Sequence, residues 1–200
     1  MTRRFVVLAA MAALLAGASL AGASHAQAQG FGFFDDSRDI MGGGPNYYSR
    51  GGASPIARTT VNVPANYAPG TIVINTAERR LYLIQGGGTA ISYGIGVGRD
   101  GFRWSGVHRI TAKREWPGWT PPAEMRRRRP DLPGHMAGGI ENPLGARALY
   151  LGSTLYRIHG SNEPETIGQA VSSGCFRMTN EDVVDLYGRV GVGTTVIVKN

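Results

Sequence analysis

Cys175 and His159 are the two residues of this chain whose types could together perform nucleophilic chemistry. Cys175 is the only cysteine, and it lies in the segment Ser172-Ser173-Gly174-Cys175-Phe176-Arg177. His159 precedes it by sixteen residues. A thiol attacks as its thiolate, and an imidazole within hydrogen-bond reach can take up the proton and return it to a leaving amine. The pair predicts acyl transfer with Cys175 as nucleophile and His159 as general base and acid.

Neighbouring residues are candidates for supporting roles. Gly174 lets the backbone pass close to a substrate, and its amide and that of Cys175 are expected to form an oxyanion hole. Arg177 lies two residues beyond the cysteine, on the same side of an extended chain, where it would favour the thiolate or bind a substrate carboxylate. Because no acid is clearly positioned to orient His159, a backbone carbonyl near Gly160 or Ser161 is the expected acceptor.

Two other interpretations of these residues remain open. An unpaired cysteine is often a buried structural residue. A metal site would need ligands from His108, His135, His159 and Cys175, which do not form the close sequence pairs typical of structural zinc sites. We therefore expect neither a metal nor another cofactor.

The N-terminal 28 residues have the pattern of a secretory signal peptide. Arg3 and Arg4 precede an apolar, alanine-rich run, and Ala26-Gln27-Ala28 supplies a small-residue cleavage site. No cysteine directly follows the run, and no later segment is apolar over the length of a membrane span. The sequence predicts cleavage after Ala28, export to the periplasm and no membrane span in the mature protein. A lone thiol in an oxidising compartment favours a chemical role for Cys175.

The charge balance suits an anionic envelope rather than a nucleic acid. The chain carries a formal net charge of +7, and removal of residues 1–28 takes away two arginines and leaves +5. The run Arg126 to Arg129 is ended by Pro130, and no nucleic-acid-binding motif accompanies it. Nucleic acid is therefore not an expected partner.

Hydrophobic patterning predicts a mostly β domain after a linker. Residues 29–68 are rich in Gly, Ser, Pro and Asn and are predicted to be a flexible linker, and residues 69–200 are predicted to fold. Strands are predicted at 71–74, 81–84, 90–97, 107–111, 149–151, 155–158 and 194–198, the early ones as an antiparallel meander. A capping box at 179–182 predicts one short helix directly after the cysteine segment.

The proline-rich stretch from Trp116 to Gly145 fits none of these elements. A structureless loop of this length is usually functional, so it is either a lid or substrate wall, or an irregular insertion anchored by Trp116 and Trp119.

The ordered motifs of residues 69–198 resemble the YkuD-type L,D-transpeptidases. The resemblance rests on Ile158-His159-Gly160 and on 172–178, with support from 70–75, 142–147 and 180–183. It implies a β-sandwich catalytic domain over 69–200 whose Cys175 attacks the amide between the L-centre of meso-diaminopimelate and D-alanine in a peptidoglycan stem. Many relatives carry His before the Gly-Cys pair, where this chain has Ser173. A serine at this position could contribute only a hydrogen bond of its hydroxyl or a backbone contact.

The resemblance also implies the partners and leaves the acceptor open. Release of D-alanine would leave a thioester on Cys175, resolved by an amine of another stem (a 3→3 cross-link) or of an envelope protein. Water as acceptor would make the enzyme an L,D-carboxypeptidase. A sortase-like transpeptidase is disfavoured by the His-to-Cys spacing and the residues before the cysteine. A non-catalytic wall-binding protein is disfavoured because Cys175, His159 and Arg177 are all present.

Overall fold

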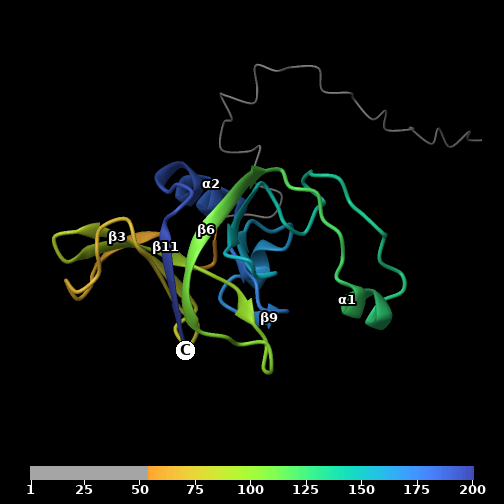
Figure 1. Cartoon of the computed structure of the whole chain (residues 1–200), viewed down its shortest axis with the longest axis horizontal. Helices are drawn as coiled ribbons and strands as arrows, with labels where there is room; N and C mark the ends of the chain where they lie inside the picture. The colour runs from red at the N-terminus through yellow and green to blue at the C-terminus, as the bar shows by residue number, and fades with distance from the viewer. Residues whose placement is uncertain (1–53) are drawn as a thin grey trace, which may run out of the picture. The chain divides into compact units, whose positions relative to one another are not determined.

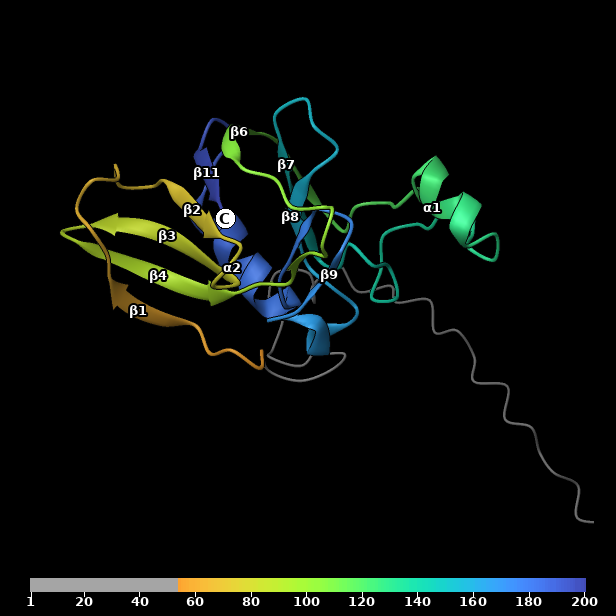
Figure 2. The same cartoon turned by 90° about the horizontal axis from the view of Figure 1, so that it is seen from below.

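The computed structural model describes residues 54–200 of the chain, and the fold is shown in Figures 1 and 2. The predicted signal peptide and the first part of the predicted linker lie outside the described residues. Over the described range, every helix is too short or too polar to cross a lipid bilayer.

Nine strands form one continuous sheet, and its first half is built around a meander. β2 (Ile72–Asn75), β3 (Arg80–Gly86) and β4 (Thr89–Gly94) pair antiparallel in chain order, as the sequence predicts. β1 (Thr59–Asn62) adds to the free edge of β4. The C-terminal β11 (Thr195–Lys199) joins the other side, where it pairs parallel to β2. The parallel pairing departs from the expected meander and ties the end of the chain to its first core strand.

The ten-residue strand β6 (Gly106–Glu115) connects the two halves of the sheet. Its first residues pair with β11, and its later residues pair with β7 (Arg147–Leu151) after a register shift between Ile110 and Ala112. β8 (Arg157–His159) and then β10 (Phe176–Arg177) complete the second half. A separate two-stranded sheet pairs β5 (Val97–Gly98) with β9 (Ala170–Ser172).

Both halves of the large sheet contribute to one hydrophobic core, which gives the sandwich character expected of the fold. The core combines Ile72 and Leu81 from the first half with Leu149, Ile158 and Phe176 from the second. Figure 2 shows the two groups of strands on either side of α2 (Asn180–Arg189). The site elements β8 and β10 are therefore fixed by the core beneath them.

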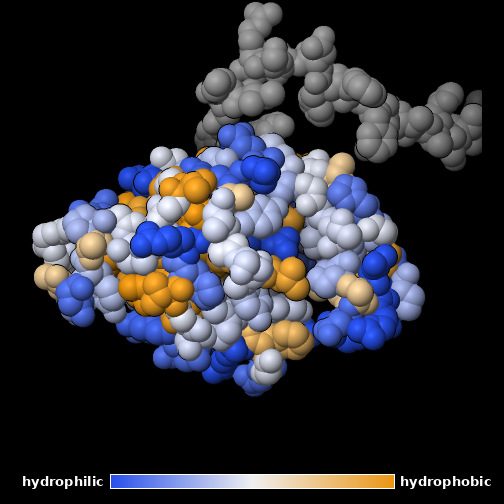
Figure 3. Space-filling model, in the orientation of Figure 1, coloured by the Kyte–Doolittle hydropathy of each residue, from blue (hydrophilic) through white to orange (hydrophobic). Residues whose placement is uncertain are grey.

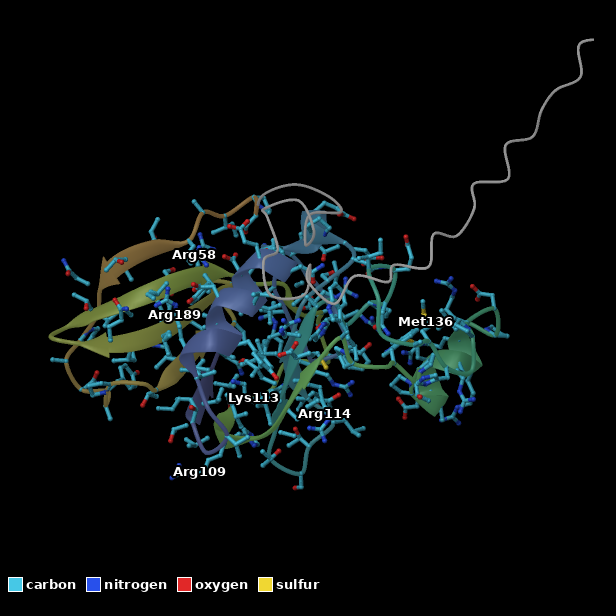
Figure 4. All side chains as sticks on the ribbon, turned by 90° about the horizontal axis from the view of Figure 1, so that it is seen from above. Arg58, Arg109, Lys113, Arg114, Met136 and Arg189 are labelled. Carbon is cyan, nitrogen blue, oxygen red and sulfur yellow. The ribbon has the colours of Figure 1, made fainter. Side chains whose placement is uncertain are left out.

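The helix α2 forms where the capping box predicts it. The Thr179 side chain accepts a hydrogen bond from the Asp182 amide at 3.2 Å, and Val183 and Leu186 point into the core. At the other end, Lys113 Nζ donates to the carbonyls of Tyr187 (2.7 Å) and Val190 (2.6 Å), which places a cation at the negative end of the helix. Figure 4 shows Lys113 reaching α2 from β6.

Five elements were not expected from the sequence, and one of them is the 3₁₀ helix η1 (Pro164–Thr166). β1 lies within the range predicted as linker, so the part of that range at 59–62 belongs to the folded sheet. The helix α1 (Ala123–Arg128) lies inside the proline-rich loop, and β9 and β10 flank the cysteine. All five are short, and pairing with residues distant in the chain stabilises the three strands more than their own periodicity does. α1 buries none of its residues.

Candidate active site

Cys175 lies in a tight turn between β9 and β10 that is held by side-chain hydrogen bonds. Ser172 Oγ accepts from the Gly174 amide at 3.1 Å and donates to the Cys175 carbonyl at 2.6 Å. Trp104 Nε1 donates to the Gly174 carbonyl at 2.8 Å. The Gly174 amide is thus engaged by Ser172 and is not directed at a substrate, contrary to the expected oxyanion hole. The Cys175 amide is left as the remaining candidate donor.

Glycine is required at position 174 for two reasons. Its φ of +108° lies in the left-handed region that other residues rarely adopt. A Cβ at this position would also overlap the ring of Tyr156. That ring is itself fixed by stacking on Trp104, with the centroids 4.5 Å apart and the planes at 11°.

His159 ends β8 with one ring nitrogen committed to the backbone. Its side chain is 4% exposed, and Nδ1 lies 2.6 Å from the Gly160 carbonyl oxygen. Because a carbonyl only accepts, Nδ1 carries the proton and Nε2 is the basic nitrogen. The backbone carbonyl expected near Gly160 is therefore present. Gly160 is itself packed so that a Cβ would overlap Asn180 Oδ1.

Strand register places Arg157 beside the nucleophile. β10 pairs parallel to β8 with Phe176 opposite Ile158 and Arg177 opposite His159, so the preceding residue, Cys175, is level with Arg157. Arg157 acts to lower the pKa of the thiol, chiefly through its charge, and the thiol itself donates to the Leu155 carbonyl at 3.8 Å. Arg157 is not among the site residues that the sequence predicted. The available signal was its position two residues before His159, which puts both side chains on one face of a strand.

Arg177 lines the same cavity but is held by a carboxylate. Its Nη1 lies 2.7 Å from Glu163 Oε2 and 3.3 Å from Thr166 Oγ1. Glu163 comes from the loop between β8 and β9, so this ion pair ties that loop to β10. Arg177 remains near enough to act on both Cys175 and His159 through its charge.

Burial favours the neutral forms of both Cys175 and His159. Desolvation raises the pKa of the Cys175 thiol, and Arg157 and then Arg177 oppose that shift. Desolvation, followed by the charge of Arg177, lowers the pKa of His159 to about 3. The resting pair is therefore thiol and imidazole, and proton transfer between them requires the charge rearrangement that accompanies attack.

A cavity of about 710 Å³ is lined by Cys175, His159, Ser173 and Arg177 together with other residues. This volume is within the range of small-molecule and peptide sites. More than half of its lining comes from the loop 116–145, which we call the cavity loop and which includes α1. Of the two interpretations of this loop, the structure supports a substrate wall.

Asn142 fixes the base of the cavity loop. Its side chain is 1% exposed, and its Nδ2 donates to the carbonyls of Pro117 (3.1 Å), Ala137 (2.8 Å) and Met136 (3.3 Å). Its Oδ1 accepts from the Leu144 amide at 2.9 Å. One buried amide thus joins both ends of the loop.

Residues 54–200 bring together no group of three or more His, Cys, Asp or Glu side chains that could hold a metal ion. The histidines occupy separate environments: His108 packs edge-on against Trp104, and His135 Nδ1 lies 3.0 Å from Thr120 Oγ1.

Comparisons with known proteins agree with this arrangement. The model of the family described as the L,D-transpeptidase catalytic domain, YkuD, matches residues 69–198. The probable L,D-transpeptidase YbiS of Escherichia coli is 40% identical over 156 residues, which are 71% of this chain and 50% of that protein. The chain spans about half the length of the curated relatives it matches first.

Solved structures similar to the chain include the following two. A probable carnitine operon oxidoreductase from Brucella melitensis is 48% identical, with a TM-score of 0.50, and the match covers 77% of this chain and 99% of that one. The name oxidoreductase belongs to that protein and is not transferred to this chain. The family match and YbiS both indicate an L,D-transpeptidase catalytic domain. The Ldtfm–avibactam carbamoyl enzyme has a TM-score of 0.53 at 19% identity, covering 67% of this chain and 50% of that one, and is similar in fold.

Proposed function

The chain belongs to the L,D-transpeptidase catalytic domain family, and from that premise we propose that it is a cysteine-dependent acyltransferase of the cell envelope. Its donor is a peptidoglycan tetrapeptide stem, from which D-alanine leaves, and its acceptor is an amine of a second stem or of an envelope protein. The observation that supports this most directly is that the Cys175 thiol and the His159 ring line one cavity, with Nδ1 of His159 bonded to the Gly160 carbonyl.

Acylation begins with transfer of the thiol proton to His159 Nε2. The sulfur then attacks the carbonyl carbon of the L-centre of diaminopimelate, and a C–S bond forms while the carbonyl oxygen becomes negative. Collapse of this intermediate breaks the C–N bond, and the proton on Nε2 passes to the departing nitrogen of D-alanine. The product is a thioester on Cys175 and free D-alanine.

The buried environment of His159 favours the second proton transfer. A group whose charged form is destabilised by burial is a weak base and, once protonated, a strong acid. Arg157 compensates at the first step, because its positive charge favours the thiolate and lowers the pKa of Cys175. In deacylation, His159 takes a proton from the acceptor amine as that amine attacks the thioester, and the cysteine leaves as the thiol.

Localisation forms part of the proposal. We propose that the protein acts in the periplasm after cleavage of the signal peptide between Ala28 and Gln29. Mass measurement of the protein isolated from envelope extracts tests this, because the mature protein should begin at Gln29. An uncleaved N-terminus on the envelope protein would contradict it.

Intact-mass measurement of the purified mature protein with a tetrapeptide stem tests the chemistry. We expect one adduct with the mass of the stem minus D-alanine, no adduct on Cys175→Ala, and much slower acylation of His159→Ala. An adduct that persists on Cys175→Ala would overturn the proposal, and an unchanged rate for His159→Ala would remove the histidine from the base role. Membership of this family also leads us to expect that a carbapenem acylates Cys175, and labelling elsewhere would count against the proposal.

Products formed with mixed acceptors identify the second half-reaction. A supply of free stems, a lysine-bearing envelope peptide and water distinguishes cross-linking, protein attachment and carboxypeptidase activity by mass. The protein would be a carboxypeptidase if only hydrolysed stem accumulates, and a non-catalytic wall-binding protein if no adduct or product forms.

A further inference from the structure

The cavity that holds Cys175 is strongly cationic. Four arginines and one acid are the charged groups of its lining: Arg126, Arg128, Arg157, Arg177 and Glu124. With His159 neutral, the lining carries a net charge of +3. Only Arg157 and Arg177 lie on the strands beside the nucleophile, and the other two reach the cavity from α1 on the cavity loop.

The arginines of α1 differ in how they are used. Arg126 and Arg128 line the cavity, and no ion pair engages them within residues 54–200. Arg127, between them, does not line it. Arg129, just beyond the helix, forms a two-fold hydrogen-bonded pair with Asp131 at 2.8 and 2.6 Å. The surface over α1 is predominantly hydrophilic in Figure 3, and nitrogen-tipped side chains gather around this helix in Figure 4.

We propose that Arg126 and Arg128 bind free carboxylates of the peptide in the cavity, so that the cavity loop selects stems whose carboxylates are not amidated. The proposal rests on the proposed function and adds a specificity determinant to it. Guanidinium groups pair with carboxylates through two parallel hydrogen bonds, and an amide offers neither the charge nor the second acceptor.

The position of these arginines predicts which kinetic step they affect. They lie on the cavity loop, whose base is fixed by Asn142, and not on the strands that carry Cys175 and His159. Their pairing with a carboxylate is formed in the bound substrate and does not change during attack. Uniform binding of this kind lowers KM and leaves kcat unchanged.

Acylation kinetics of the full mature protein test the proposal with a matched control on the same helix. The substrates are the tetrapeptide stem and an analogue with its free carboxylates converted to amides. With the free-carboxylate stem, we expect the double variant Arg126→Gln/Arg128→Gln to raise KM roughly tenfold, because two exposed ion pairs each contribute several-fold at most. Arg127→Gln removes the same charge outside the cavity and should change KM less than twofold.

Replacing the two arginines and amidating the peptide should not have additive effects on KM, because both changes remove the same contact. The double variant and the wild type should therefore have similar KM values for the amidated analogue, and high salt should narrow their difference on the free stem. The proposal is overturned if Arg127→Gln is as damaging as the double variant, or if the wild type acylates with both peptides at equal KM.

Calorimetric binding to Cys175→Ala protein separates this inference from the chemistry. Preference for the free-carboxylate stem, lost in Cys175→Ala/Arg126→Gln/Arg128→Gln, supports the carboxylate site even if acylation fails. An active wild type without that preference would retain the proposed function and remove the carboxylate site. Equal binding of both peptides, or no binding of either, counts against it.

Discussion

Gly174 lies against the ring of Tyr156 so closely that the nucleophile turn has no room for a Cβ at this position. The ring cannot move aside easily, because it stacks on Trp104, and Trp104 in turn donates a hydrogen bond to the Gly174 carbonyl. These three residues come from separate parts of the chain and together determine where the Cys175 thiol points.

Gly174→Ala should therefore both destabilise the protein and displace the nucleophile. We expect a loss of about 2–4 kcal/mol in the free energy of unfolding, from the left-handed backbone and the overlap together, and at least a hundredfold slower acylation. Gly101→Ala is the matched control, because Gly101 has φ +82° but open space around its missing Cβ. Denaturant unfolding and intact-mass kinetics measure both; equal losses in the two variants would show that the Tyr156 contact is unimportant.

Arg157 should contribute more than Arg177 to the reactivity of the thiol. Because burial raises the pKa of Cys175 and Arg157 is the charge that most opposes it, alkylation by iodoacetamide should be slow at pH 7. The rate should increase about tenfold per pH unit up to the thiol pKa, with no plateau at low pH. At pH 8, Arg157→Gln should slow alkylation roughly three- to tenfold, and Arg157→Lys should restore part of the rate.

Arg177→Gln is the comparison for this measurement, because Arg177 is already paired with Glu163. It should slow alkylation less than Arg157→Gln does. A larger effect of Arg177→Gln would contradict the ranking, and a pH-independent alkylation rate would indicate a thiolate–imidazolium pair instead of the neutral pair.

His159 should make the native state less stable in acid. Its pKa in the folded protein is about 3, whereas an exposed imidazole titrates near 6.5. As the pH falls below about 6.5, the unfolded chain binds a proton that the native protein does not, so stability is lost towards pH 3. This single group should cost up to about 3 kcal/mol at pH 4. Urea unfolding at pH 7 and pH 4 should show a smaller pH dependence for His159→Asn; identical pH dependence would refute the neutral buried imidazole.

Asn142 should control the order of the cavity loop. Asn142→Ala leaves the carbonyls of Pro117 and Ala137 without their buried donor, which should cost about 2–4 kcal/mol. Amide hydrogen exchange should become faster across residues 116–145 and stay unchanged in β2 and β11. Asn162→Ala removes a single, more exposed bond, from Nδ2 to the Glu141 carbonyl at 3.1 Å, and should have a much smaller effect. Uniformly faster exchange throughout the protein would instead indicate global destabilisation.

Patterns that are local in the chain predicted much of the fold. In the strands of the meander, apolar residues either alternate with polar ones or form continuous runs between turn residues. The capping box at Thr179 marks the start of α2. These elements could therefore be placed from the sequence. The parallel pairings of β11 with β2 and of β10 with β8 could not, because they join residues far apart in the chain. β1, at Thr59–Asn62, is exposed on most of its residues, and its polar sequence resembles the linker around it.

The sequence by itself indicated the pair that we propose to react, since Cys175 and His159 stand out by residue type and by the segments around them. It also placed a carbonyl acceptor near Gly160. Tertiary structure decided their state and their neighbours. Register between β8 and β10 put Arg157 at the thiol, Glu163 engaged Arg177, and the cavity loop brought Arg126 and Arg128 towards the nucleophile. Burial, which sets the pKa values of Cys175 and His159, depends on the packing of the whole domain and cannot be assigned to any short segment.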